Sequence, residues 1–92
     1  MIVSFRHKGL ECFYRTGSKA GIQPKHEVRL RAQLARLDAA LVPQDMALPA
    51  WKLHPLSGAM KGCWAVSVDE NWRLIFRFVG EDVEMVDYLD YH

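Results

Sequence analysis

The sequence predicts an α+β fold in which N-terminal helices pack on one face of a small, mainly antiparallel, twisted sheet. The chain has 92 residues, a length that fits one compact domain, so we expect a single domain over residues 1–92. Its hydrophobic share of 50% and charged share of 25% are typical of a globular protein. Apolar residues recur at helical spacing in the first half and at alternate positions from Trp51 onward.

The N-terminal segment is predicted to supply a short strand and a helix. Residues 2–5 form an apolar run that fits a strand at the edge or in the interior of the sheet. The helix covers residues 8–15, where Leu10, Phe13 and Tyr14 lie at the spacing of one helix face.

The second predicted helix has the clearest pattern. It begins near Pro24, which suits a first helical position, and Pro43 ends it. One apolar stripe runs along it through Leu30, Leu34, Leu37 and Leu41. Three arginines fall away from this stripe and are expected to face water or a partner: Arg29, Arg31 and Arg36.

The second half predicts an antiparallel meander. Three alternating segments, residues 62–68, 72–79 and 83–89, are separated only by the short polar turns 69–71 and 80–82. Even-numbered positions of the middle strand are apolar and should pack on the helices. Its other face should be partly open to solvent, and Arg73 and Arg77 point to that side.

Charge is distributed unevenly along the chain. Residues 1–50 carry a balance of +4 and residues 51–92 a balance of −3, which together give the net +1. A basic half attracts phosphate backbones, but it is equally the pattern of a solvated helix surface. The overall charge alone does not indicate a nucleic-acid-binding protein.

Several classes of protein are disfavoured. No uncharged stretch comes close to the ~20 apolar residues of a membrane span, and the N-terminus does not read as a signal peptide. Cys12 and Cys63 form no CxxC pattern, and we expect two buried free thiols, with a disulfide in a secreted domain as the alternative. We therefore expect a cytoplasmic protein with no membrane partner, no cofactor and no metal site.

Arg73 and two histidines are the candidates for chemistry. Arg73 inside a strand is either an arginine packed over neighbouring aromatics or a phosphate anchor. His54, beside a proline, is either structural or catalytic, and His92 ends the chain just after Asp90 and Tyr91. The two other histidines, His7 and His26, are expected at the surface.

This set suggests cleavage of a phosphodiester in RNA. One group would take the proton of the 2′-hydroxyl, another would protonate the 5′-oxygen leaving group, and a cation would hold the charge that builds on phosphorus. A docked His92 could act as such an acid or base near neutral pH.

Several motifs give the chain a close resemblance to one family. They are WKLHPLSG at 51–58, GCWAVSV at 62–68, NWRLIF at 71–76 and DYLDYH at 87–92, with IVSF and HKGL near the start. The chain resembles HigB toxins of the RelE-like superfamily, which belong to bacterial toxin–antitoxin systems. The combination of L-H-P-L-x-G, N-W-R and a terminal D-Y-H is specific, and the resemblance covers nearly the whole chain.

The resemblance implies a microbial RNase fold and ribosome-dependent, metal-independent cleavage of mRNA in the A site. The functional positions that carry over are His54, Arg73, Asp90, Tyr91 and His92. Arg73 would hold the scissile phosphate, His92 and His54 would handle protons, Asp90 would orient an imidazole or the ribose, and Tyr91 would stack on a base or bond a phosphate. The residues expected to bind RNA are Lys52, Lys61, Arg77, Arg29, Arg31 and Arg36.

The expected partners are a HigA-like helix-turn-helix antitoxin and the 70S ribosome with its mRNA. Ser57 stands where close relatives often carry a lysine, so either Lys61 supplies that charge or the activity is lower. Two alternatives stay open: a ParE-like toxin that inhibits DNA gyrase, and a non-catalytic member that only binds antitoxin or RNA.

Overall fold

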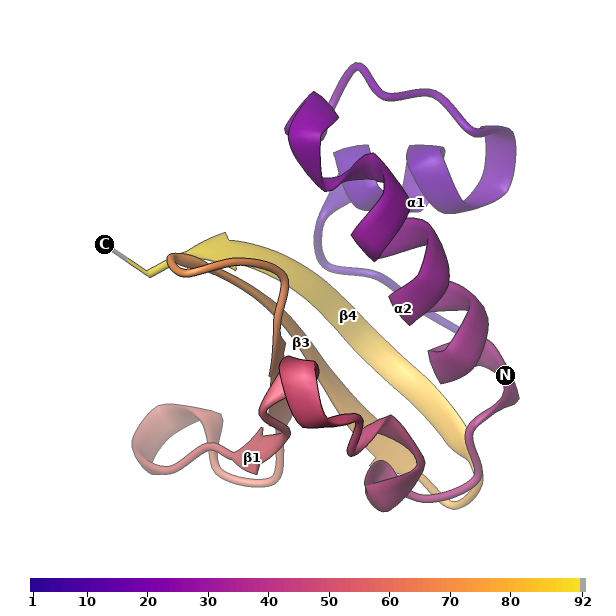
Figure 1. The fold of residues 1–92 in the computed structure, drawn as a ribbon. Coiled ribbons are helices and arrows are strands. Elements are labelled where there is room, and N and C mark those ends of the chain that lie inside the picture. Colours follow the sequence, from indigo (N-terminus) through magenta and orange to yellow (C-terminus); the bar gives the residue numbers. More distant parts are fainter. Residues whose placement is uncertain (92) are drawn as a thin grey trace.

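The elements of a computed structural model, which describes residues 1–91, follow the predicted order (Figure 1). The helices are α1 (Lys8–Thr16) and α2 (Glu27–Ala39), and the strands are β1 (His54–Pro55), β2 (Trp64–Ser67), β3 (Trp72–Val79) and β4 (Asp82–Asp90). The strands form one antiparallel sheet in the order β1-β2-β3-β4. The predicted α+β fold and its meander are therefore confirmed.

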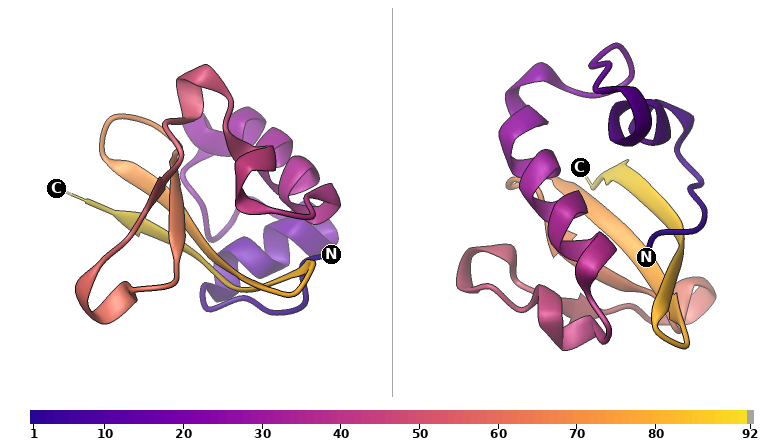
Figure 2. Two further views of the ribbon diagram at one scale, coloured as in Figure 1. Left: turned by 90° about the horizontal axis from the view of Figure 1, so that it is seen from below. Right: turned by 90° about the vertical axis from the view of Figure 1, so that its right-hand side faces the viewer.

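Both helices lie on the same side of the sheet, and the core fills the space between the two layers (Figures 1 and 2). Leu74 and Phe76 of β3 are fully buried there against Leu10 of α1 and Leu30 of α2. Full burial of one such side chain contributes about 1.5–3 kcal/mol. Among the described residues, no helix is long and apolar enough to cross a membrane.

Helix α1 is fixed at both ends. The His7 side chain caps its start, because Nδ1 accepts a hydrogen bond from the Leu10 N–H at 2.9 Å. Gly17 ends it with φ 81°, a left-handed conformation that suits glycine, and its N–H donates to the Phe13 carbonyl. The prediction that His7 lies at the surface was wrong, since this half-buried residue also packs edge-on against the Tyr88 ring.

Helix α2 follows a single 3-10 turn that begins at Pro24. Three leucines of the predicted stripe are buried, but the prediction for Leu41 was wrong. The helix ends at Ala39, four residues before Pro43, because Ala40 adopts an extended conformation. The N–H groups of Leu41 and Val42 then donate to the Asp45 carboxylate, which leaves Leu41 more than half exposed.

The N-terminal run over residues 2–5 lies beside β4 without forming a regular strand. It makes two isolated parallel bridges, from Ile2 to Val83 and from Phe5 to Val86. Asp38 of α2 ties this segment to both helices, because its Oδ1 accepts hydrogen bonds from the Ile2 N–H and the Tyr14 hydroxyl, each at 2.9 Å.

A bulge interrupts the pairing of β3 with β4. Ile75 pairs with Asp87 but Arg77 pairs with Glu84, so β4 carries one extra residue between these pairs. Met85 absorbs it with φ 59°. As a result Glu84 and Asp87, three positions apart, lie on the same open face of the sheet.

Both cysteines are free thiols, as predicted, but neither is buried. Cys12 is exposed on α1, where its sulfur lies 3.6 Å from the Thr16 hydroxyl, and Cys63 is half-buried just before β2. Residues 1–91 contain no group of three His, Cys, Asp or Glu side chains that could hold a metal ion.

Candidate active site

A cleft of about 280 Å³ lies where β2 turns into β3, and three cationic side chains line it. Arg73 comes from β3, Arg29 from α2, and Lys52 from the loop that precedes β1. The remaining lining residues are Ala50, Ser67, Val68, Asp69 and Glu70. We call this hollow the basic cleft, and its charge makes it a candidate for binding a phosphate group.

Arg73 is half-buried and is held by the turn that precedes it. Its Nη1 donates to the carbonyl oxygens of Asp69 at 2.9 Å, Glu70 at 3.2 Å and Trp72 at 3.0 Å. Within residues 1–91 it forms no ion pair with a carboxylate and does not lie over an aromatic ring. The carbonyl groups therefore orient the guanidinium without neutralising it, and its positive charge can bind an anionic ligand.

His54 lies on the same face of the sheet as Arg73. It pairs with Ala65, which pairs with Ile75, two positions from Arg73 on β3. Strand spacing and rise place the His54 and Arg73 Cα atoms about 12 Å apart. Two long side chains can approach one phosphodiester across this separation.

The exposed His54 imidazole has a defined tautomer in its neutral form. Nδ1 lies 2.9 Å from the Lys52 carbonyl oxygen, which can only accept, so Nδ1 carries the proton. Nε2 then has a free lone pair that points away from this bond. The neutral ring is therefore arranged to take a proton at Nε2.

The C-terminal candidates do not all face the basic cleft. Asp90, the last residue of β4, pairs with Trp72, whose side chain lies on the helix-facing side of the sheet, opposite to that of Arg73. Tyr91 is 45% exposed, and its N–H donates to the Asn71 carbonyl at 2.6 Å. His92 lies outside the described residues.

Two of the predicted RNA-binding residues line a separate hollow of about 150 Å³ on the open face of the sheet. Lys61 and Arg77 stand there with Arg6 around a floor that includes Ile75. Arg77 is paired with the Glu84 carboxylate, whereas Lys61 forms no ion pair within residues 1–91. This hollow therefore presents the cations of Arg6 and Lys61 together with the carboxylate of Asp87, which also lines it.

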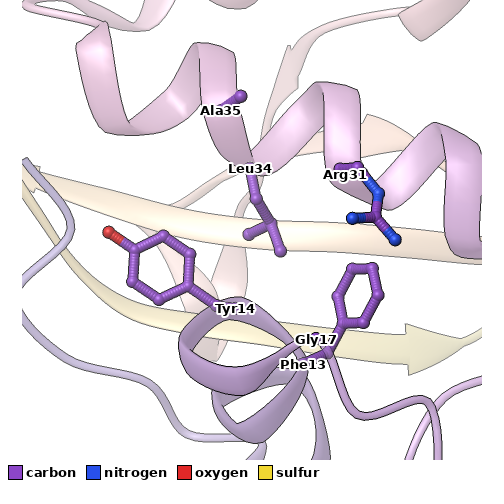
Figure 3. Close-up of a pocket in the computed structure, with 6 residues that line it drawn as sticks. All are labelled: Phe13, Tyr14, Gly17, Arg31, Leu34 and Ala35. Atoms are coloured by element: carbon purple, nitrogen blue, oxygen red, sulfur yellow. The ribbon is translucent and has the colours of Figure 1, made fainter.

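The three arginines of α2 do not form one surface. Arg29 alone lines the basic cleft. Arg31 pairs with Glu27 and lies over the Phe13 ring at 5.5 Å, in a groove between α1 and α2 (Figure 3). Arg36 donates from Nε to the Asp45 carbonyl at 2.7 Å.

His26, like His7, lies away from the surface position that the sequence predicts, and it is the more deeply buried of the two. It was expected at the surface, but it is 3% exposed and both ring nitrogens are hydrogen-bonded. Its partners, Asp69 and Tyr88, lie 43 and 62 positions away in the chain. No local pattern carries that information, because the contacts form only when the sheet closes against the helical layer.

The carboxylate of Asp69, which also lines the basic cleft, accepts hydrogen bonds from donors within the fold. Burial alone would raise the pKa of its carboxyl, but hydrogen bonds from His26 and from the Trp72 and Asn71 N–H groups outweigh burial and hold the pKa well below its usual value. The carboxylate is therefore ionised at neutral pH, with its charge satisfied by donors inside the fold.

Comparison with known proteins identifies the family. Residues 3–92 match the model described as the RelE-like toxin of type II toxin–antitoxin system HigB. The chain belongs to the HigB-like toxin family. The HigB-like chain is 36% identical to the endoribonuclease HigB of Proteus vulgaris over 92 residues, which is all of both chains. It is 34% identical over 94 residues to toxin HigB-1 of Vibrio cholerae, covering all of this chain and 98% of that one.

Solved structures of related toxins share the fold. The YoeB/ParE toxin from Agrobacterium tumefaciens aligns over 99% of this HigB-like chain and 96% of its own, with a TM-score of 0.62 at 19% identity. YafQ in the Escherichia coli DinJ–YafQ toxin–antitoxin complex aligns over 98% and 90%, with a TM-score of 0.55 at 18% identity. At these identities the likeness shows the RelE-like fold alone.

Proposed function

We propose that this HigB-like protein is the toxin of a type II toxin–antitoxin system and that it cleaves mRNA in the ribosomal A site. Support for an endoribonuclease comes from the full-length similarity to a relative named as one. The observation that supports the catalytic roles is that Arg73, which lines the basic cleft, shares a face of the sheet with His54.

The proposed reaction is attack of the ribose 2′-hydroxyl on the adjacent phosphate, with release of the 5′-oxygen. Arg73 binds the phosphate oxygens and stabilises the negative charge that grows on them. A histidine, His54 or His92, takes the proton of the 2′-hydroxyl, and the other protonates the leaving oxygen. These side chains supply all the proton transfers, so we expect cleavage that does not need a metal.

The other predicted residues have supporting roles in this proposal. Tyr91 stacks on a base or bonds a phosphate, and Asp90 orients an imidazole or the ribose. Lys52 and Arg29 extend the positive charge of the basic cleft, and Lys61 and Arg77 extend it across the open face toward the rest of the RNA. Arg31 and Arg36 face other directions and would contact ribosomal RNA.

We also propose an antitoxin partner of the HigA-like helix-turn-helix kind. The family model describes a toxin–antitoxin system, and the YafQ toxin of similar fold is found in complex with DinJ. Binding of such a partner would keep the toxin inactive until the antitoxin is removed.

The deciding experiment is cleavage of mRNA on programmed 70S ribosomes, with free RNA and chelator-treated toxin in parallel. The carboxyl terminus is left untagged because His92 is the last residue. We expect cleavage only on ribosomes, because they hold the substrate in a reactive geometry, and the same rate after chelator treatment. Lack of cleavage by a folded, antitoxin-binding protein would contradict the proposal, and a gyrase supercoiling assay would then test the ParE-like alternative.

Arg73→Ala tests the site itself. Loss of a charge-stabilising donor should lower the cleavage rate by about 10²–10³-fold. Arg15→Ala is the matched control, since Arg15 lies on α1 and pairs with Glu11 rather than lining the basic cleft. Equal rates for Arg73→Ala and the wild type would remove Arg73 from the mechanism.

A further inference from the structure

A buried chain of hydrogen bonds connects the helical layer to the turn that holds Arg73. His26 Nδ1 lies 2.5 Å from the Tyr88 hydroxyl, and His26 Nε2 lies 2.5 Å from Asp69 Oδ2. The ring also packs edge-on against Trp72, at 5.6 Å between ring centroids. His26 therefore contacts β4, the β2–β3 turn and the first residue of β3.

The direction of these hydrogen bonds follows from their partners. An ionised carboxylate only accepts, so Nε2 carries a proton and donates to Asp69. In the neutral ring Nδ1 then accepts from the Tyr88 hydroxyl, whose oxygen in turn accepts from the Gln23 N–H at 3.3 Å. Each polar group of the chain is thereby satisfied, which a buried network requires.

Asp69 transmits this anchoring to the turn. Its Oδ1 accepts from the N–H groups of Asn71 and Trp72, each at 2.9 Å, and so fixes the conformation of residues 69–72. Lys25 adds a longer ion pair, 3.9 Å from Asp69 Oδ2. The carbonyl oxygens of the same turn are the acceptors that hold the Arg73 guanidinium.

His26 and Tyr88 cannot act on RNA directly. They are 3% and 2% exposed, and both nitrogens of the ring are engaged. Any effect of His26 on the reaction must therefore pass through the groups it holds.

We propose that His26 is a positioning residue for Arg73: its hydrogen bond to Asp69 holds the β2–β3 turn in the conformation whose carbonyl oxygens orient the guanidinium toward the basic cleft. Only the expected effect of His26 on mRNA cleavage rests on the proposed function. The coupling between His26 and Arg73 is a property of the free protein.

The test begins with the uncomplexed toxin, before any activity is measured. His26→Phe keeps an aromatic ring and removes both hydrogen bonds, and Phe13→Leu is a control that loosens the core at α1, away from the turn. We expect the NMR signal of the Arg73 side-chain N–H to shift and to exchange faster with solvent in His26→Phe, and to be unchanged in Phe13→Leu. An unaltered Arg73 signal in folded His26→Phe would overturn the proposal, whether or not the wild type cleaves mRNA.

Cleavage kinetics give the second readout. A guanidinium misplaced by about 1 Å should lower kcat by roughly 10–100-fold. KM for programmed ribosomes should stay within about twofold, because the remaining basic residues still bind RNA. In an Arg73→Ala background, His26→Phe should cause no further loss, and an additive loss would show that His26 acts by another route.

Asp69→Asn provides a second variant in case His26→Phe does not fold. Asp69 is one-third exposed, so the fold should tolerate the exchange, while the charged acceptor for His26 is lost. We expect the same shift of the Arg73 signal and the same direction of change in kcat. Wild-type values for both in this variant would refute the connection through Asp69.

Discussion

Replacement of Gly9 by alanine should destabilise the protein, although the same change in most helices stabilises it. Gly9 lies in the first turn of α1, where alanine is favoured over glycine by up to about 1 kcal/mol. In this fold, however, the glycine faces the backbone of Gly21 in the loop that follows α1. A Cβ atom on Gly9 would lie 2.7 Å from both the Cα atom and the carbonyl oxygen of Gly21.

The size of the effect follows from this contact. Non-bonded carbon atoms need about 3.5 Å, so the loop backbone must move by nearly 1 Å to accept the new methyl group. Overpacking of this kind costs about 1–3 kcal/mol, which exceeds the gain in helix propensity. We expect Gly9→Ala to lose about 1–2 kcal/mol, a fall in Tm of roughly 4–16 °C for a domain of this size.

Thermal and urea unfolding of the free protein would measure this difference. Gly17→Ala is the matched control, because its Cβ meets nothing within 4 Å and only its φ of 81° opposes the change. Gly21→Ala should be at least as damaging as Gly9→Ala, since its Cβ would lie 2.4 Å from the Gly9 Cα. A Gly9→Ala protein as stable as the wild type would refute the close approach of these two backbones.

Three further predictions concern charged groups. Folding lowers the pKa of Asp69, so the ionised carboxylate stabilises the fold fully above the ordinary pKa of 3.8 and less at lower pH. In urea unfolding, the loss of stability caused by Asp69→Asn should therefore shrink as the pH drops from 7 to 2. Burial and the hydrogen bond to Asp38 raise the pKa of Tyr14. Asp38→Asn should therefore lower this pKa in a titration followed by tyrosinate absorbance. An unchanged titration curve would contradict the contact between the two side chains. Glu70 lines the basic cleft, and Glu70→Gln should tighten the binding of a short RNA about two- to threefold at low salt, as expected when one charge ~8 Å from a phosphate in water is removed. Glu81→Gln, in the other hairpin turn, should leave the affinity unchanged. Equal effects of the two variants would mean that RNA binding depends only on net charge.

The parts of the fold that the sequence predicts are those encoded by local spacing. The leucines of α2 are buried, and so are Val66, Leu74 and Phe76 on the predicted apolar face of β2 and β3. Ala65 and Ile75 on the opposite face are buried as well, which alternation alone did not predict. The bulge at Met85 carries no such signal, because a left-handed conformation at methionine depends on the pairing of the two strands. The helix end at Ala39 also escaped prediction, since the Asp45 carboxylate competes for the next N–H groups.

The candidate site divides in the same way. Side-chain chemistry and motifs single out His54 and Arg73, but only strand register shows that they share a face. β1 contains two residues and has no alternation from which to read an orientation. Its place in the helical half predicts a surface position for His26, whereas contacts with the distant residues Asp69 and Tyr88 bury it.

The same pairing explains why net charge is a poor guide to this protein. The second half of the chain is acidic by count, yet several of its carboxylates are paired with cations of the fold: Asp69 with Lys25, Glu84 with Arg77 and Asp82 with the N-terminal amine. Arg73, Lys52 and Lys61, by contrast, form no ion pairs within residues 1–91. Paired charges cancel at short range, and unpaired ones project a field toward a ligand. An RNA approaching the open face of the sheet therefore meets a surface more positive than the composition of its strands implies.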